Sequence, residues 1–186
     1  MSFDNAENVD VVVGLEPPVG IVATAVAAGA ASPCAKSKRG VVIWARNREH
    51  SPLKGACIEG TMYAIQASAH NARPDGPCDG SDACRRDCGK VAVHAEQAAI
   101  LKCTDWFRNG NRKQDVVEML HVKVVDGQAV PGGPPSCWQC SRIILAAKVD
   151  YMWLLEDGRG WVRRTAQQFH RETLRNCGLH APSGEQ

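Results

Sequence analysis

A chain of 186 residues is long enough for one α/β domain with a full core and too short for two comfortable ones, so we expect a single domain over residues 1–186. The formal net charge of +2 and an aromatic content of 5% argue against a dedicated nucleic-acid or membrane surface and favour a small-molecule substrate. The first ten residues are polar and acidic and do not resemble a signal peptide. We therefore expect a reducing, cytoplasmic setting, in which the nine cysteines are ligands or buried thiols and not disulfides. We expect flexible ends at residues 1–15 and 181–186.

The first part of the chain predicts one helix and two strands. Val19–Ala31 is apolar but too short to span a bilayer, and Pro17 and Pro18 before it suit the first turn of a helix. Gly40–Arg46 is rich in β-forming residues and predicts the first core strand. Thr61–Ser68 predicts a second strand, which we expect to pair antiparallel with the first.

The rest of the chain alternates strands and helices. Helix formers and end signals predict helices over Ala95–Arg108, Ser141–Lys148 and Arg164–Cys177. The expected strands are Val116–Val125 and Tyr151–Leu155, and a fifth over Trp161–Val162 is left open. Asp126–Pro135, rich in glycine and proline, is expected to be a loop. This order predicts a mixed sheet with helices on its faces.

Two short motifs carry the chemistry. His94 and Glu96 open the helix that follows residue 94, and Cys137 and Cys140 stand at the start of another helix. Cysteines at i and i+3 share one face of a first helical turn, where the helix dipole favours thiolates. One imidazole and two thiolates are the ligands that a tetrahedral zinc takes when its fourth position is kept for water. A Cys-x-x-Cys pair alone also occurs in redox and structural zinc sites, but the two motifs together indicate a catalytic zinc.

The order of these motifs resembles that of the zinc-dependent nucleobase deaminases of the cytidine deaminase superfamily. The resemblance covers Pro33–Leu155 and implies a three-layer α/β/α fold with a central mixed sheet of about five strands. It also implies one catalytic zinc on His94, Cys137 and Cys140, with Glu96 as the acid–base residue that does not bind the metal. The chain departs from the family at the first cysteine, because Ser136 separates it from the proline that usually precedes it directly.

Within that superfamily the chain is most similar to the CMP/dCMP deaminases. Ala69–Cys78 resembles their segment after the second strand, which implies that Asn71 hydrogen-bonds a sugar hydroxyl, although a turn residue is the simpler alternative. Such enzymes commonly form homo-oligomers. Charge alone nominates four residues for a phosphate: Lys36, Lys38, Arg39 and Arg73.

Three further cysteines, Cys78, Cys84 and Cys88, lie in a polar segment that we expect to be a loop, and Cys34 precedes the first strand. Several deoxycytidylate-type deaminases hold a second, structural zinc with residues from these two regions, so the resemblance suggests a second site. Its fourth ligand would be Cys34 or His70. The alternative is that these are free or buried thiols.

The sequence thus predicts a zinc-dependent hydrolytic deaminase that converts a cytosine moiety to uracil with release of ammonia, on a nucleotide or nucleoside such as dCMP. Deamination of guanine, adenine or a base within nucleic acid is an alternative, and so is a non-catalytic, zinc-stabilised binding module. Glu96 argues against the module, because a closed structural site needs no general base. Trp138 is either a wall for the ring or core packing, and His50, His121, His170 and His180 show no partner pattern.

Overall fold

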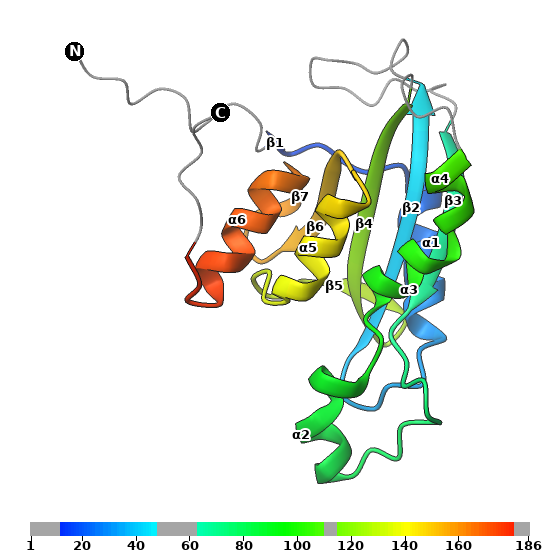
Figure 1. The fold of residues 1–186 in the computed structure, drawn as a ribbon, viewed down its shortest axis with the longest axis vertical. Coiled ribbons are helices and arrows are strands. Elements are labelled where there is room, and N and C mark those ends of the chain that lie inside the picture. The colour runs from blue at the N-terminus through cyan, green and yellow to red at the C-terminus, as the bar shows by residue number, and fades with distance from the viewer. Residues whose placement is uncertain (1–11, 48–62, 110–114, 181–186) are drawn as a thin grey trace, which may run out of the picture.

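The computed structural model describes residues 12–47, 63–109 and 115–180 (Figure 1). The helices are α1 Val19–Ala30, α2 Asp82–Val91, α3 Ala95–Lys102, α4 Thr104–Asn109, α5 Trp138–Ala146 and α6 Ala166–Asn176. The strands are β1 Val12–Val13, β2 Lys38–Asn47, β3 Tyr63–His70, β4 Asp115–Val125, β5 Gln128–Val130, β6 Tyr151–Glu156 and β7 Gly160–Thr165. Thr61 and Met62 of the expected second strand lie outside the described residues, as do 1–11 and 181–186 of the expected flexible ends.

The strands form one open mixed sheet in the order β1-β7-β6-β4-β2-β3, with β5 paired to β4. β4 and β6 run parallel, joined by a crossover through α5, and the other neighbours run antiparallel. The expected count of about five strands was too low. The two extra strands, β1 and β5, have two and three residues and are too short to carry a periodic signal. The open question at Trp161–Val162 is answered by β7, which forms a hairpin with β6.

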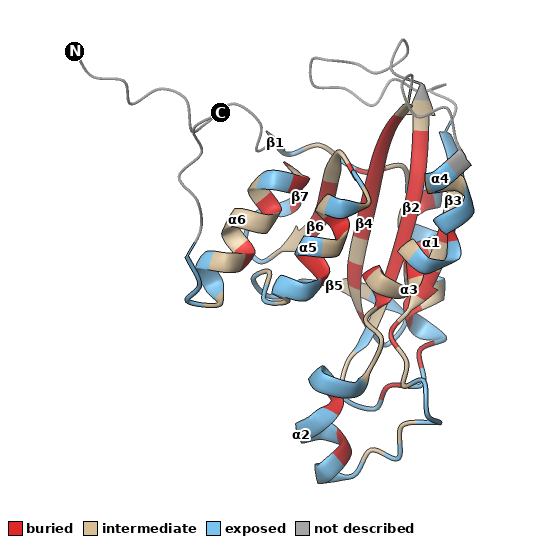
Figure 2. Cartoon of the chain, viewed as in Figure 1, coloured by how far each residue is buried: buried red, intermediate tan, exposed pale blue. Residues whose placement is uncertain are grey.

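Helices cover both faces of the sheet, as expected. Val41 and Ile43 of β2 pack with α3, α5 and α6, whereas Val42 and Trp44 pack with α1 on the opposite face. Burial on both sides explains why β2 is an unbroken apolar run, because neither face is left for polar residues. Figure 2 shows the buried stripe along β2 and β4 at the centre of the sheet.

Three local expectations were wrong. The cysteine-rich segment is not a loop throughout, because residues 82–91 form α2, whose first turn is capped where the Ser81 hydroxyl accepts a hydrogen bond from the Cys84 N–H. The loop Asp126–Pro135 contains β5. The helix expected over Ala95–Arg108 breaks at Cys103, where the Cys103 thiol and the Thr104 hydroxyl both donate to carbonyl oxygens of the preceding turn.

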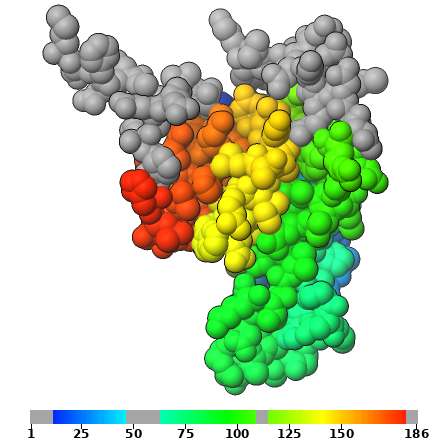
Figure 3. All heavy atoms as spheres, in the orientation of Figure 1, coloured from blue at the N-terminus to red at the C-terminus, as the bar shows by residue number. Residues whose placement is uncertain are grey.

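The two motif helices lie side by side on one face of the sheet, and α2 stands apart at one end of the molecule (Figures 1 and 3). Both motif helices begin near the junction between the sheet and α2.

Val12 and Val13, which fall within the expected flexible end, pair with β7.

Candidate metal centre and its cavity

His94 and Cys137 each occupy the residue just before a helix. His94 precedes α3, and its backbone N–H donates to the Gln97 side chain over 3.1 Å. Cys137 precedes α5, and its Sγ accepts a hydrogen bond from the Cys140 N–H over 3.3 Å. Both side chains therefore stand at a helix N-terminus, where the partial positive charge of the first turn favours an anionic thiolate.

These two positions bring three potential ligands together. His94, Cys137 and Cys140 each offer one atom, and these atoms lie within 4.8 Å of one another. The Sγ atoms of Cys137 and Cys140 are 2.9 Å apart, and Nδ1 of His94 is 3.1 Å from Sγ of Cys140. No other group of three such residues comes together in the described part of the chain. One imidazole and two thiols fit zinc, and three protein ligands are the number that a catalytic zinc takes.

The two thiols share one proton. The hydrogen bond with Cys140 lowers the pKa of Cys137 to about 5, and the same hydrogen bond raises the pKa of Cys140. Hydrogen bonding to Cys137 also raises the pKa of His94. The ligand set thus holds one thiolate already, and a metal has to displace the proton of the second thiol.

The three ligands line a cavity of about 320 Å³, a volume in the range of small-molecule sites. The other polar residues of its lining include Lys36, Arg39, Asn71, Glu96, His121 and Lys123. Three cationic side chains and one carboxylate give the lining an excess of positive charge. Of the four residues proposed for a phosphate, Lys36 and Arg39 line the cavity, whereas Lys38 donates to the Ala30 carbonyl and Arg73 pairs with Asp75.

Glu96 lies in the same cavity without joining the three ligands. Its side chain is 8% exposed, and Oε1 is 3.4 Å from Nδ1 of His121. Burial acts to raise the pKa of Glu96, but the neighbouring side chains of His121, His94 and Arg39 and a backbone hydrogen bond together lower it. A buried, ionised carboxylate beside a metal site is a group that can accept a proton from a water molecule there.

Asn71 is buried in the cavity wall, where its amide already holds the protein together. Oδ1 accepts hydrogen bonds from the Arg39 N–H over 2.8 Å and from the Ser32 hydroxyl over 3.0 Å, and Nδ2 donates to the Ser37 carbonyl over 2.9 Å. An amide has two N–H donors, so one remains for a ligand. Asn71 therefore fixes the segment that leads into β2. Only its second amide N–H could still donate to a sugar hydroxyl.

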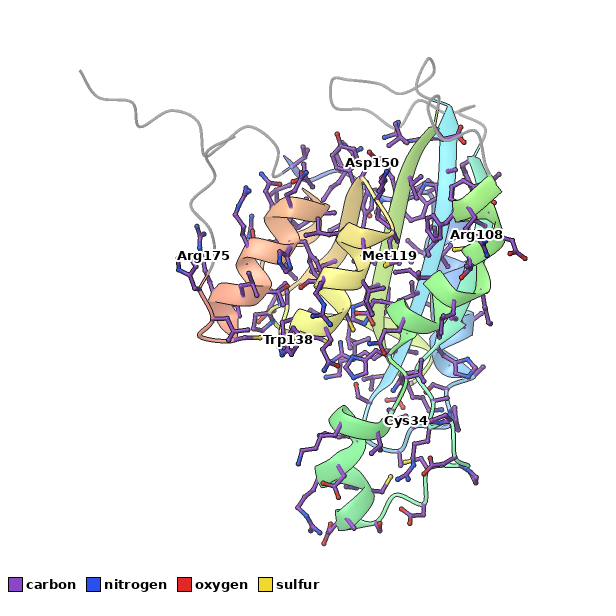
Figure 4. The ribbon with its side chains drawn as sticks, viewed as in Figure 1. Cys34, Arg108, Met119, Trp138, Asp150 and Arg175 are labelled. Atoms are coloured by element: carbon purple, nitrogen blue, oxygen red, sulfur yellow. The ribbon has the colours of Figure 1, made fainter. Side chains whose placement is uncertain are left out.

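The four cysteines proposed for a second metal form two pairs. Cys34 and Cys88 lie 3.8 Å apart between their Sγ atoms, and Cys78 and Cys84 lie 3.2 Å apart. Among the residues described, no three of these thiols lie within 4.8 Å of one another. Figure 4 labels Cys34 beside α2, and Cys34 and Cys88 also line the cavity.

Sequence reasoning missed His121 and Lys123 and misjudged Trp138. Strand alternation could have found His121, since it shares a face of β4 with Val117 and Met119, the face that α3 covers. Trp138 is 39% exposed, and Arg142 stacks over its ring at 5.1 Å, so this tryptophan is neither core nor part of the cavity lining.

The sequence matches no family model, and no curated protein matches it. Among solved structures the chain is similar to the dCMP deaminase from the cyanophage S-TIM5 in its apo form, with 20% sequence identity and a TM-score of 0.44 over 74% of this chain and 82% of that one. None of the helices described here has the length and apolar character that a bilayer crossing requires. What is established is a mixed α/β fold with a His-Cys-Cys group that could hold a metal.

Proposed function

We propose that the protein is a zinc-dependent hydrolytic deaminase with a cytidine deaminase-like fold. It would convert a cytosine moiety to uracil and release ammonia, with a nucleotide or nucleoside such as dCMP as substrate. The observation that supports this best is a buried carboxylate, Glu96, next to a group of one imidazole and two thiols but outside it. A zinc-stabilised binding module has no use for such a carboxylate.

His94, Cys137 and Cys140 would hold the metal, and zinc with three protein ligands lowers the pKa of a water molecule toward neutrality. Glu96 would take a proton from the attacking water and give it to the ring nitrogen beside the amine-bearing carbon. The carboxylate would then take the second proton, from the hydroxyl now on that carbon, and give it to the departing amine, so that the carbon–nitrogen bond breaks and a carbonyl is left. Water and the cytosine moiety are thereby converted to uracil and ammonia. The cationic lining of the cavity supports an anionic substrate such as a nucleotide.

The test is ammonia release from a panel of bases, nucleosides, nucleotides and single-stranded nucleic acid, incubated with the zinc-loaded protein. We expect turnover of a cytosine-containing monomer. The Glu96→Gln variant is the matched blank, because it keeps the shape of the side chain without its charge. Preference for guanine or adenine would change the substrate, and a lack of turnover by the wild type on the whole panel would refute the proposal.

A second, structural zinc on Cys34, Cys78, Cys84 and Cys88 is part of the proposal. The short distances between sulfurs within the two pairs, 3.8 Å and 3.2 Å, support it, and zinc binding would bring the two pairs together. We expect elemental analysis to give two zinc ions per chain, and one in the double variant Cys84→Ser/Cys88→Ser. A Cys177→Ser control should keep both. A count of one in the wild type, unchanged in the double variant, would remove the second site.

The proposal treats residues 1–186 as one domain and includes assembly into homo-oligomers and a cytoplasmic location. A reducing compartment suits a ligand set that binds metal only when its cysteines are not oxidised to a disulfide. Light scattering coupled to size-exclusion chromatography measures the oligomeric state. A monomer at all concentrations would contradict assembly into homo-oligomers.

A further inference from the structure

His121 is a partly buried histidine at the wall of the cavity, on the central strand β4. Its strand neighbours are Val41 on β2 and Leu154 on β6. Its side chain is 16% exposed, and its Nδ1 is 3.4 Å from Oε1 of Glu96. The strand therefore places an imidazole directly against the carboxylate from the side of the sheet.

The surroundings of the ring select its protonation. Nε2 of His121 is buried and has no hydrogen-bond partner among the described residues, so a proton there would be an unsatisfied buried donor. A proton on Nδ1 faces a carboxylate oxygen instead. Burial also lowers the pKa of His121, which favours the neutral ring. These observations indicate a neutral imidazole with its single proton on Nδ1.

We propose that His121 is a positioning residue, which holds Glu96 by a hydrogen bond from Nδ1–H to Oε1. A glutamate side chain has several rotatable bonds, and fixing one oxygen directs the other toward the water and the substrate. The separation of 3.4 Å is long for such a bond, as is common for catalytic contacts without substrate, and we expect it to shorten when the cavity fills.

The 3.4 Å contact between His121 and Glu96 is observed, the hydrogen bond is inferred from it, and only the kinetic consequence rests on the proposed function. The first measurement is therefore independent of activity. In a long-range proton–nitrogen NMR spectrum of the labelled protein, His121 should show the Nδ1–H tautomer. In Glu96→Ala the acceptor is gone, and His121 should shift toward the Nε2–H form that free histidine prefers. An Nε2–H ring in the wild type, or an Nδ1–H ring unchanged in Glu96→Ala, would overturn the inference.

The second measurement compares two replacements in steady-state kinetics with dCMP. In His121→Asn, the side-chain amide nitrogen can take the place of Nδ1, whereas His121→Leu keeps similar bulk without a donor. We expect His121→Leu to lower kcat on the order of 10- to 100-fold, with KM changed by no more than about twofold, because the lost bond is to a charged group. His121→Asn should recover most of this loss.

The control is His180→Leu, an exposed histidine that follows α6 and lies outside the cavity lining, which should leave kcat unchanged. Zinc content and melting temperature are measured for every variant. Equal losses of kcat in His121→Asn and His121→Leu, or a rise in KM at constant kcat, would contradict a positioning role. If His121→Leu does not fold, the NMR comparison and His121→Asn still decide. If the wild type deaminates nothing, the proposed function fails, and the NMR result alone decides the hydrogen bond.

Discussion

Replacing Glu96 by glutamine separates catalysis from metal binding at this site. The carboxylate lies outside the group of His94, Cys137 and Cys140, so its loss should leave the zinc in place. Glutamine has nearly the same volume as glutamate, so the buried site is not emptied. The variant can still accept a hydrogen bond from His121 but cannot take a proton from water at neutral pH.

The expected loss follows from the number of steps in which Glu96 takes part. Removing a positioned acid–base group costs about 100- to 10,000-fold in rate, which is roughly 3–5 kcal/mol of barrier. Glu96 would serve several proton transfers in one cavity, so we expect the upper end of that range or beyond. His94→Ala should behave differently, because it removes a metal ligand and lowers zinc affinity and stability together.

Zinc content, melting temperature and deamination are measured on Glu96→Gln, His94→Ala and the wild type in parallel. The reasoning predicts that Glu96→Gln keeps zinc and melting temperature but loses turnover, and that His94→Ala loses all three. Near-normal turnover in Glu96→Gln, or a loss of zinc as complete as in His94→Ala, would refute the role given to the carboxylate.

Three further outcomes are expected. Zinc binding at neutral pH should release at least one proton, that of Cys140, because Cys137 is already a thiolate; any proton on the ligating nitrogen of His94, whose pKa is raised, is released as well. Calorimetry in buffers of different ionisation enthalpy measures this, and no release would contradict the shared proton. Gly40→Ala should lower the free energy of unfolding by about 1–3 kcal/mol or more, because a Cβ there would meet the Ala25 carbonyl and lie 2.6 Å from the Gly29 nitrogen. The control Gly89→Ala, in open space on α2, should raise it by about 0.5–1 kcal/mol in the same urea titration. Activity on dCMP should exceed that on single-stranded nucleic acid, and a polymer preference that falls steeply with salt would overturn the monomer expectation.

The strands and motif helices could be predicted because their signals are local. β2 and β4 are long runs of β-branched and apolar residues, and the structure confirms both within a few residues. The crossover between β4 and β6 follows from the helix between them, and the His-Cys-Cys group follows from motifs that each begin a helix.

The remainder depends on contacts that no local pattern carries. α2 mixes strong helix formers with aspartate, cysteine and glycine, and its capping serine and buried Cys84 and Cys88 explain why it is a helix. The role of Asn71 could not be read from its motif, because its amide is engaged by residues more than thirty positions away. The contact of His121 with Glu96 could not be predicted for the same reason, since Glu96 is on another element.

The central claim is that the protein removes the amino group of a cytosine ring by hydrolysis, at a zinc site in this cavity. The most direct measurement is to incubate the zinc-loaded protein with dCMP in water enriched in heavy oxygen and to analyse both products. The account predicts dUMP with one heavy oxygen on the ring and an equal amount of ammonia, and neither product after the zinc is removed by a chelator. Deaminated product without heavy oxygen, or product formed at the same rate by the zinc-free protein, would contradict it.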